Sequence, residues 1–256
     1  MAREKQAKKC AVKGRLGRYS PKVVGSGEYE VCLSKSQLKH LFHGTKPGKD
    51  IGCGMFACVY DRGGKQVVKI TRDREDVEGL LASKGMDRVV KVFDIRELPG
   101  AGTDVRTGKP IPIYAVVAER LRPLNKKETD WYDKPFDHTR ALVLKHAEEY
   151  SGPAKKYTLT PADTEAIAMK SCKGIVPTKK CLTFSKEFSE TWMQLVRHGI
   201  VWVDSHVGNI AFDDKGKWKV IDLGYSGTKK RTKLQTLLGG TGQLKKMRRR
   251  VVKPLP

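Results

Sequence analysis

The pattern of apolar residues changes near residue 121, and this change constrains the fold more than any other feature of the sequence. Before it, short β-rich runs alternate with glycine turns, as in "MFACVYDRGGKQVVKI", where a Gly-Gly turn joins two strand-like runs. After it, apolar residues recur at helical spacing. This order predicts an α+β protein, with a small antiparallel sheet and one helix first and a reduced, mainly helical part second.

Start signals place several helices. Ser34 is a candidate cap for a short helix ending at His43, and Thr160-Pro161 opens another, with Asp163 in its first turn. The remaining helices are predicted over 74–83, 137–150 and 185–198. In the last of these, one apolar stripe contains Phe188, Trp192, Leu195 and Val196, and we interpret it as core.

The net charge of +23 is unevenly distributed. Residues 1–22 carry eight Lys or Arg against one Glu, and residues 229–256 carry ten and no acid, so both ends are expected to be solvated arms. Such charge favours acidic proteins, nucleic acid or ribosomes as partners. The chain accordingly divides into a basic extension (1–46), a sheet domain (47–121), a helical domain (122–228) and a basic tail (229–256).

Two observations bear on location. The sequence has no apolar run of about 18 residues and no secretory signal, so we expect no membrane segment and no membrane partner. The six cysteines show no paired C-x-x-C spacing and are interpreted as reduced thiols of a cytoplasmic protein.

Three oxygen-bearing side chains stand in turns beside two short strands of the segment "IVWVDSHVGNIAFDDKGKWKVIDLGYS". Asn209 precedes one strand, and Asp222 follows the other with a glycine two residues later. A carboxylate and an amide oxygen brought together suit Mg²⁺, which uses few protein ligands. Asp204, five residues before Asn209, could orient an attacking hydroxyl or accept its proton.

The predicted hairpin supplies groups suited to phosphate. Gly52 and Gly54 would let backbone N–H groups approach phosphates closely, and Lys69, in the partner strand, could add a fixed positive charge. A glycine-rich hairpin, a strand lysine, D-x-x-x-x-N and a strand-end D-x-G, in this order, form a specific combination.

With these residues the chain resembles the protein-kinase-like superfamily over about residues 48–226. In the glycine-rich loop Gly52, Gly54 and Val59 match, and Ala57 replaces the third glycine. The resemblance implies a bilobal fold that binds ATP and Mg²⁺.

The resemblance also assigns roles. Lys69 would be the phosphate-binding lysine, Asp204 the catalytic aspartate, and Asn209 and Asp222 the metal ligands. The helix glutamate paired with the lysine would be Glu78, with Glu75 as second choice. The backbone at Glu119 and Leu121 would contact adenine.

The sequence departs from the family pattern at several positions, and these departures indicate which members of the superfamily it resembles. Trp202-Val203 replaces the His-Arg pair before the catalytic aspartate, and no A-P-E segment follows Asp222. His206 gives the D-x-H-x-x-N pattern of aminoglycoside and choline kinases and is a candidate γ-phosphate contact, although local packing of the loop would explain it equally. The compact arrangement resembles short kinases encoded by bacteriophages, which would act in the host cytoplasm.

The expected function is an ATP- and Mg²⁺-dependent serine/threonine protein kinase whose substrates are acidic or nucleic-acid-associated host proteins. One alternative is a small-molecule kinase, as the pattern around His206 indicates. The other is a non-catalytic, kinase-like protein that binds nucleic acid or ribosomes through its basic ends.

Overall fold

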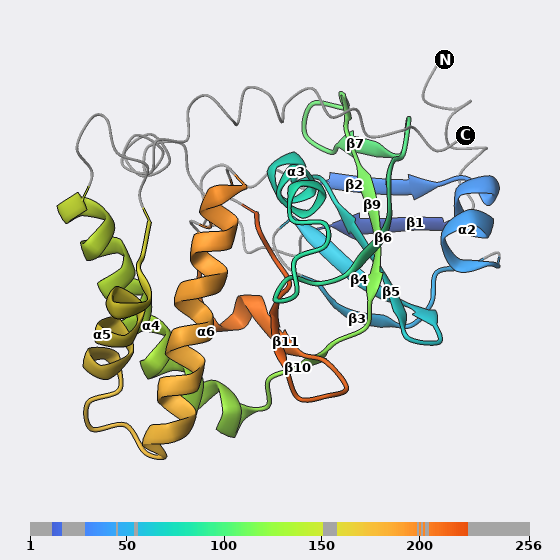
Figure 1. Ribbon diagram of the computed structural model, residues 1–256. Helices are drawn as coiled ribbons and strands as arrows, with labels where there is room; N and C mark the ends of the chain where they lie inside the picture. The colour runs from blue at the N-terminus through green and yellow to red at the C-terminus, as the bar shows by residue number, and fades with distance from the viewer. Residues whose placement is uncertain are drawn as a thin grey trace. The chain divides into compact units, whose positions relative to one another are not determined.

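The computed structural model describes residues 12–16, 29–44, 46–53, 56–150, 158–198, 200, 202 and 205–224 (Figure 1). These residues divide into two compact units. The sheet unit comprises the described residues up to Val77 together with Lys91–Arg120, and the helical unit comprises Glu78–Val90 together with the described residues from Leu121 onward. The mixed α+β class with antiparallel sheets is as predicted.

A five-stranded antiparallel sheet forms the larger part of the sheet unit, in the order β3-β4-β5-β9-β6. Its strands are β3 (Asp50–Cys53), β4 (Ala57–Gly63), β5 (Gln66–Thr71), β6 (Val92–Glu97) and β9 (Tyr114–Glu119). The predicted Gly-Gly hairpin is confirmed, because β4 pairs with β5 through a turn in which Gly63 and Gly64 have φ values of +92° and +62°. Positive φ at two successive residues is easily adopted only by glycine.

A second antiparallel sheet, in the order β1-β2-β7-β8, begins within the predicted basic extension. Its strands are β1 (Val12–Leu16), β2 (Tyr29–Leu33), β7 (Gly102–Asp104) and β8 (Pro110–Ile111). Helix α2 (Lys35–Phe42) comes directly after β2 in the chain. Ser34 caps this helix, and Ser34 and Gln37 form a reciprocal capping box.

The core of the sheet unit is aliphatic and includes side chains from β2 and α2. Part of the stretch predicted to be an extension is therefore built into the core, because its apolar side chains cover the sheet. The buried cluster consists of Val31, Leu33, Leu38, Leu41, Cys58, Val68, Ile70, Leu98, Ala101, Ile113, Ala115 and Val117.

Helices α4 (Lys126–Tyr150), α5 (Pro161–Ser171) and α6 (Thr178–Arg197) pack against one another in the helical unit (Figure 1). The start of α5 is confirmed, with Thr160 as cap and Asp163 as its partner in a capping box. No helix among the described residues combines the length and the apolar character needed to cross a membrane.

Both other long helices begin earlier than predicted. At the start of α4 the Asn125 side chain accepts from the Glu128 backbone N–H at 3.0 Å, and Glu128 accepts in return from the Asn125 N–H at 2.8 Å. This N-x-x-E signal lies outside the predicted range of 137–150. Helix α6 begins directly after Pro177, so Ser185 is a buried residue inside the helix rather than its cap.

The core of the helical unit is aromatic. Phe188, on the predicted apolar stripe of α6, has its ring centroid 4.8 Å from that of Phe136 and 5.8 Å from that of Trp202. Such edge-to-face and tilted ring pairs contribute beyond their buried area. The other rings of this cluster are those of Tyr132, Phe184, Trp192, Phe212 and Trp218.

A three-stranded antiparallel sheet completes the helical unit, in the order β10-β11-β12. Its strands are β10 (Arg122–Pro123), β11 (Ile210–Phe212) and β12 (Trp218–Val220), and the short 3₁₀ turn η1 (Val207–Asn209) leads into β11. The two strands predicted around the turn "KGK" are thereby confirmed.

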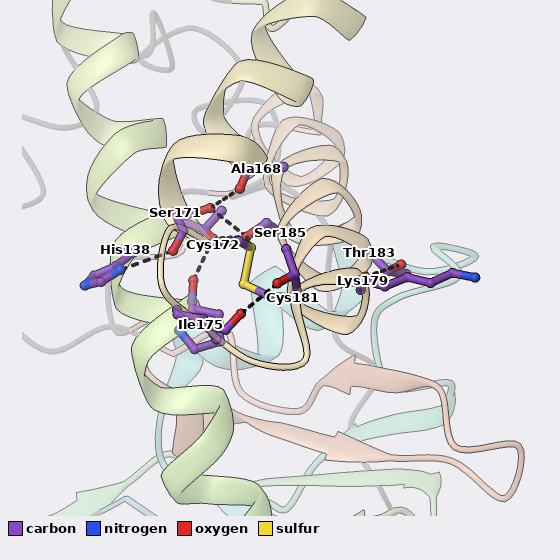
Figure 2. The surroundings of a disulfide bond; sticks show 12 residues. His138, Ala168, Ser171, Cys172, Ile175, Lys179, Cys181, Thr183 and Ser185 are labelled. Atoms are coloured by element: carbon purple, nitrogen blue, oxygen red, sulfur yellow. Dashed lines mark hydrogen bonds between the residues drawn. A yellow bond between two sulfur atoms is a disulfide. The ribbon is translucent and has the colours of Figure 1, made fainter.

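The prediction of reduced thiols is wrong for at least five of the six cysteines. Disulfides join Cys53 to Cys58 and Cys172 to Cys181, and Cys32 is disulfide-bonded as well. Cys53 and Cys58 are direct partners in the β3–β4 register. The second bond, shown in Figure 2, joins the end of α5 to the first turn of α6. Pairing set by strand register and by the approach of two helix ends cannot be recognised from C-x-x-C spacing.

Candidate functional site

The glycine-containing segment predicted to bind phosphate lies in strands β3 and β4, whose residue pairing is defined. Gly52 in β3 pairs with Val59 in β4, and Ala57 begins β4 opposite Thr71 of β5. Gly54 lies outside the described residues. The Cys53–Cys58 disulfide ties the two strands together next to this segment, a covalent link that sequence analysis did not anticipate.

Lys69 lies in β5, with Val59 opposite it on β4 and Val116 opposite it on β9. Its chain neighbours Val68 and Ile70 are buried in the aliphatic core, so the alternation of a strand places Lys69 on the other face of the sheet. There its Nζ lies 2.8 Å from Oδ2 of Asp76, and the exposed fractions of the two side chains are 13% and 1%. The lysine is thus held by a buried carboxylate.

Asp76 is in the first turn of α3 (Arg74–Ala82), which follows β5 almost directly. Asp73 fixes this turn, since its Oδ1 accepts from the backbone N–H of Glu75 at 2.9 Å and of Asp76 at 3.1 Å. Lys69 therefore forms an ion pair with Asp76, a residue that the sequence did not single out. The predicted contact of Lys69 with Glu78 or Glu75 stays a prediction. Glu78 lies further along α3 and is half-buried.

The predicted adenine-binding stretch starts at the end of β9. The backbone N–H of Glu119 donates to the Lys91 carbonyl at 2.9 Å, and its Oε1 accepts from the Lys91 N–H at 2.6 Å. The next N–H, of Arg120, donates to the Lys65 carbonyl at 2.8 Å. Both of these amides donate within the sheet unit, and the contact of the backbone at Glu119 with adenine stays a prediction. Leu121 is half-buried and belongs to the helical unit.

Asn209 and Asp222 lie at the ends of two paired strands in the helical unit. Ile210 pairs with Val220, and the Ile221 N–H donates to the Asn209 carbonyl at 3.0 Å, so both residues flank the same end of the β11–β12 ladder. Asn209 is 9% exposed and Asp222 is half-buried. Oδ1 of Asp222 accepts from the Gly224 N–H at 2.8 Å, which fixes the orientation of the carboxylate.

This pair has the donor chemistry of a magnesium site. Mg²⁺ is usually held by one or two carboxylates, with phosphate and water as its other ligands, and a carboxylate with an amide oxygen fits that preference. The described residues contain no group of three or more His, Cys, Asp or Glu side chains able to hold a metal ion. Asp204, the third predicted oxygen donor, lies outside them.

His206 folds the turn that leads to Asn209. Its Nδ1 accepts from the Gly208 N–H at 3.1 Å, and its carbonyl accepts from the Asn209 N–H at 2.9 Å. Of the two roles that the sequence left open, these contacts are those of local loop packing. The contact with γ-phosphate stays a prediction.

Two further contacts of this region were not predicted. Arg140 of α4 donates from Nε to the Ser205 hydroxyl at 2.6 Å. A Cβ placed on Gly79 of α3 would lie 2.9 Å from Cβ of Leu223, the residue after Asp222, so α3 and the D-x-G segment approach closely. Neither contact has a local sequence signal, because each joins segments far apart in the chain.

A scan against protein-family models finds no matching family, and a search of curated proteins finds no similar sequence. The assignment of a function therefore depends on the chain's own residues.

Proposed function

We propose that the chain is an ATP- and Mg²⁺-dependent phosphotransferase with a bilobal, protein-kinase-like fold, acting on serine or threonine of proteins. The observation that carries the proposal is the ion pair between Lys69 and Asp76. A buried ion pair is rarely more stabilising than a well-packed apolar pair, because both charges lose their hydration. A lysine held by such a carboxylate beside a glycine-containing hairpin suggests a binding role for its charge.

A second observation supports the same function. Asn209 and Asp222 flank one end of a β-ladder, and hydrogen bonds fix the backbone of the first and the carboxylate of the second. In phosphoryl transfer the protein mainly positions the reactants and neutralises charge, so rigid oxygen donors and a fixed cation are the groups required.

The proposed mechanism assigns one task to each group. Lys69, oriented by Asp76, binds the α- and β-phosphates, and Asn209 with Asp222 would hold Mg²⁺. When bound, the metal ion would neutralise phosphate charge. Asp204 aligns the acceptor hydroxyl, and the turn made by His206 sets the position of Asn209. Backbone groups near Gly52 and at Glu119 contribute to nucleotide binding.

The acceptor decides between the protein-kinase proposal and its rival. The D-x-H-x-x-N pattern around His206 favours a small-molecule phosphotransferase as the second candidate. The excess of positive charge favours an acidic or nucleic-acid-associated protein as the substrate, since it would raise the rate of encounter with such a partner.

The test is a phosphate-transfer assay with γ-labelled ATP and Mg²⁺, with and without bacterial lysate, on the wild type and on Asp222→Ala, Lys69→Ala and Asp76→Asn. Asp94→Asn is a matched control, because Asp94 pairs with Arg96 at 3.0 Å on the same sheet and its side chain is 33% exposed. Circular dichroism verifies that each variant is folded.

Labelled protein bands that persist in Asp94→Asn and disappear in the three site variants would support a protein kinase. ATP consumption only with small hydroxyl compounds would move the acceptor to a metabolite. Wild type without any turnover, but with salt-dependent binding to DNA or RNA, would replace the proposal with a non-catalytic binding role.

A further inference from the structure

Arg140 makes a specific contact with the loop that leads to Asn209. Its Nε donates to Oγ of Ser205 at 2.6 Å, and Ser205 is only 5% exposed. Hydrogen bonds in which one partner is charged are stronger than neutral ones. Both residues belong to the helical unit, and 65 positions of sequence separate them.

The helix that carries Arg140 is anchored at the preceding residue. Thr139 Oγ1 lies 2.5 Å from Ser185 Oγ of α6, and Ser185 Oγ lies 2.8 Å from Ser171 Oγ of α5. Figure 2 shows Ser171 and Ser185 beside the Cys172–Cys181 disulfide. A buried hydroxyl chain therefore joins α4, α5 and α6 at this level, and Arg140 extends from a rigid support.

Ser205 is followed in the chain by His206, from which hydrogen bonds lead to the proposed metal ligands. His206 accepts from the Gly208 and Asn209 amides, and the Asn209 carbonyl accepts from the Ile221 amide next to Asp222. We name residues 205–209 the ligand turn. If Ser205 moved, the ligand turn would move with it and Asn209 would be displaced.

We infer that Arg140 is a positioning residue, which fixes the ligand turn through Ser205 and so sets the geometry of Asn209 and Asp222. The inference rests on the proposed function for its catalytic consequence, but the ordering of the turn can be measured without turnover. The planar guanidinium suits this task, because it stays charged and loses little rotamer freedom per hydrogen bond formed.

The test compares Arg140→Gln, Arg140→Lys, Ser205→Ala and the Arg140→Gln/Ser205→Ala double variant with Lys134→Gln. Lys134 is an exposed cation on the same helix, so its removal is the matched change in charge. The first readout is amide hydrogen exchange at Gly208, Asn209 and Ile221, and the second is the separation of kcat from KM for ATP.

We expect exchange at these amides to rise about 10-fold in Arg140→Gln and in Ser205→Ala, and no further in the double variant, because both remove the same bond. Arg140→Lys keeps the charge but loses the Nε donor and should give an intermediate rise. Phosphate transfer should lose about 100-fold in kcat at unchanged KM for ATP, since a small misplacement of the site suffices. Lys134→Gln should match the wild type.

Wild-type exchange in Arg140→Gln, or additive effects in the double variant, would overturn the inference. Faster exchange with unchanged kcat would also overturn it, by reducing Arg140 to a structural role. If the wild type transfers no phosphate, the proposed function fails, and the exchange pattern alone decides whether Arg140 orders the ligand turn.

Discussion

The sheet unit and the helical unit are packed by different kinds of side chain. In the sheet unit, Val68, Ile70 and Val117 alternate along strands and meet Leu38 and Leu41 of α2. In the helical unit, aromatic rings from α4 and α6 stack with those of the segment around β11 and β12. All four tryptophans of the chain belong to the helical unit. Tryptophan fluorescence therefore reports on one unit, while circular dichroism reports on both.

The largest effects should come from removing one core side chain from each unit. Phe188→Ala takes a ring from the centre of the aromatic cluster and should cost about 3–5 kcal/mol of unfolding free energy, and Leu38→Ala should cost about 2–5 kcal/mol. Denaturant unfolding followed by both signals measures these losses. If the units unfold independently, Leu38→Ala will shift only the circular dichroism transition; coincident shifts in both signals would show a single cooperative unit.

The disulfides give a second contrast, because each unit contains one whose two cysteines both lie among the described residues. The Cys172–Cys181 bond closes an irregular connection between two helices, and its removal in a Cys172→Ser/Cys181→Ser variant should cost about 2–4 kcal/mol. The Cys53–Cys58 bond links strands that the β-ladder already holds together, so Cys53→Ser/Cys58→Ser should cost less. Melting temperatures with and without reductant test this order, and equal losses would contradict it.

Two glycines of one segment provide a smaller, local contrast. A Cβ on Gly48 would lie 1.6 Å from the carbonyl oxygen of Asp61, whereas a Cβ on Gly52 would meet nothing within 4 Å. Gly48→Ala should therefore cost about 1–3 kcal/mol. Gly52→Ala should change the free energy of unfolding by less than about 0.5 kcal/mol but raise KM for ATP. An unchanged KM would remove Gly52 from the nucleotide site.

The smallest contrast is between the two capping boxes. Thr160→Ala and Ser34→Ala should each cost about 1 kcal/mol. The Thr160 hydroxyl, then its backbone N–H, lowers the pKa of Asp163 in the folded protein, with His146 adding to the effect. A lowered pKa means that this stabilisation is complete above the ordinary pKa of about 4 and is lost as the pH falls through the lowered value.

The Ser34 box uses the neutral Gln37 and should not respond to acid. Unfolding measured from pH 6 downward should therefore show the Thr160→Ala difference shrinking while the Ser34→Ala difference stays constant. The same acid sensitivity in both boxes would refute this explanation.

Prediction from sequence succeeded where the signal is local. The Gly63-Gly64 turn, the Ser34 and Thr160 caps and the short β11–β12 hairpin all follow from residues close together in the chain. Such features depend on the backbone preferences of a few residues.

Prediction from sequence failed for contacts that depend on how elements are arranged in space. Glu75, Asp76 and Glu78 all lie on one short helix, and the angle at which α3 leaves β5 brings Asp76, which the sequence did not single out, to Lys69. The sequence pattern cannot supply that angle, and the resemblance favoured a glutamate. The contact of Arg140 with Ser205 was missed for the same reason.

The close approach of Gly79 to Leu223 makes the segment after Asp222 a candidate for bump-and-hole engineering. A methyl group at position 79 would press on Cβ of Leu223, so Gly79→Ala alone should disturb the neighbouring carboxylate, and Leu223→Gly, which removes that Cβ, should leave a void on its own. When the two changes are combined, the methyl group added at position 79 occupies space vacated by the side chain removed at position 223. The double variant should thus recover a folded site whose shape differs from the natural one. A ligand designed for the altered shape would then bind this variant and not the natural protein.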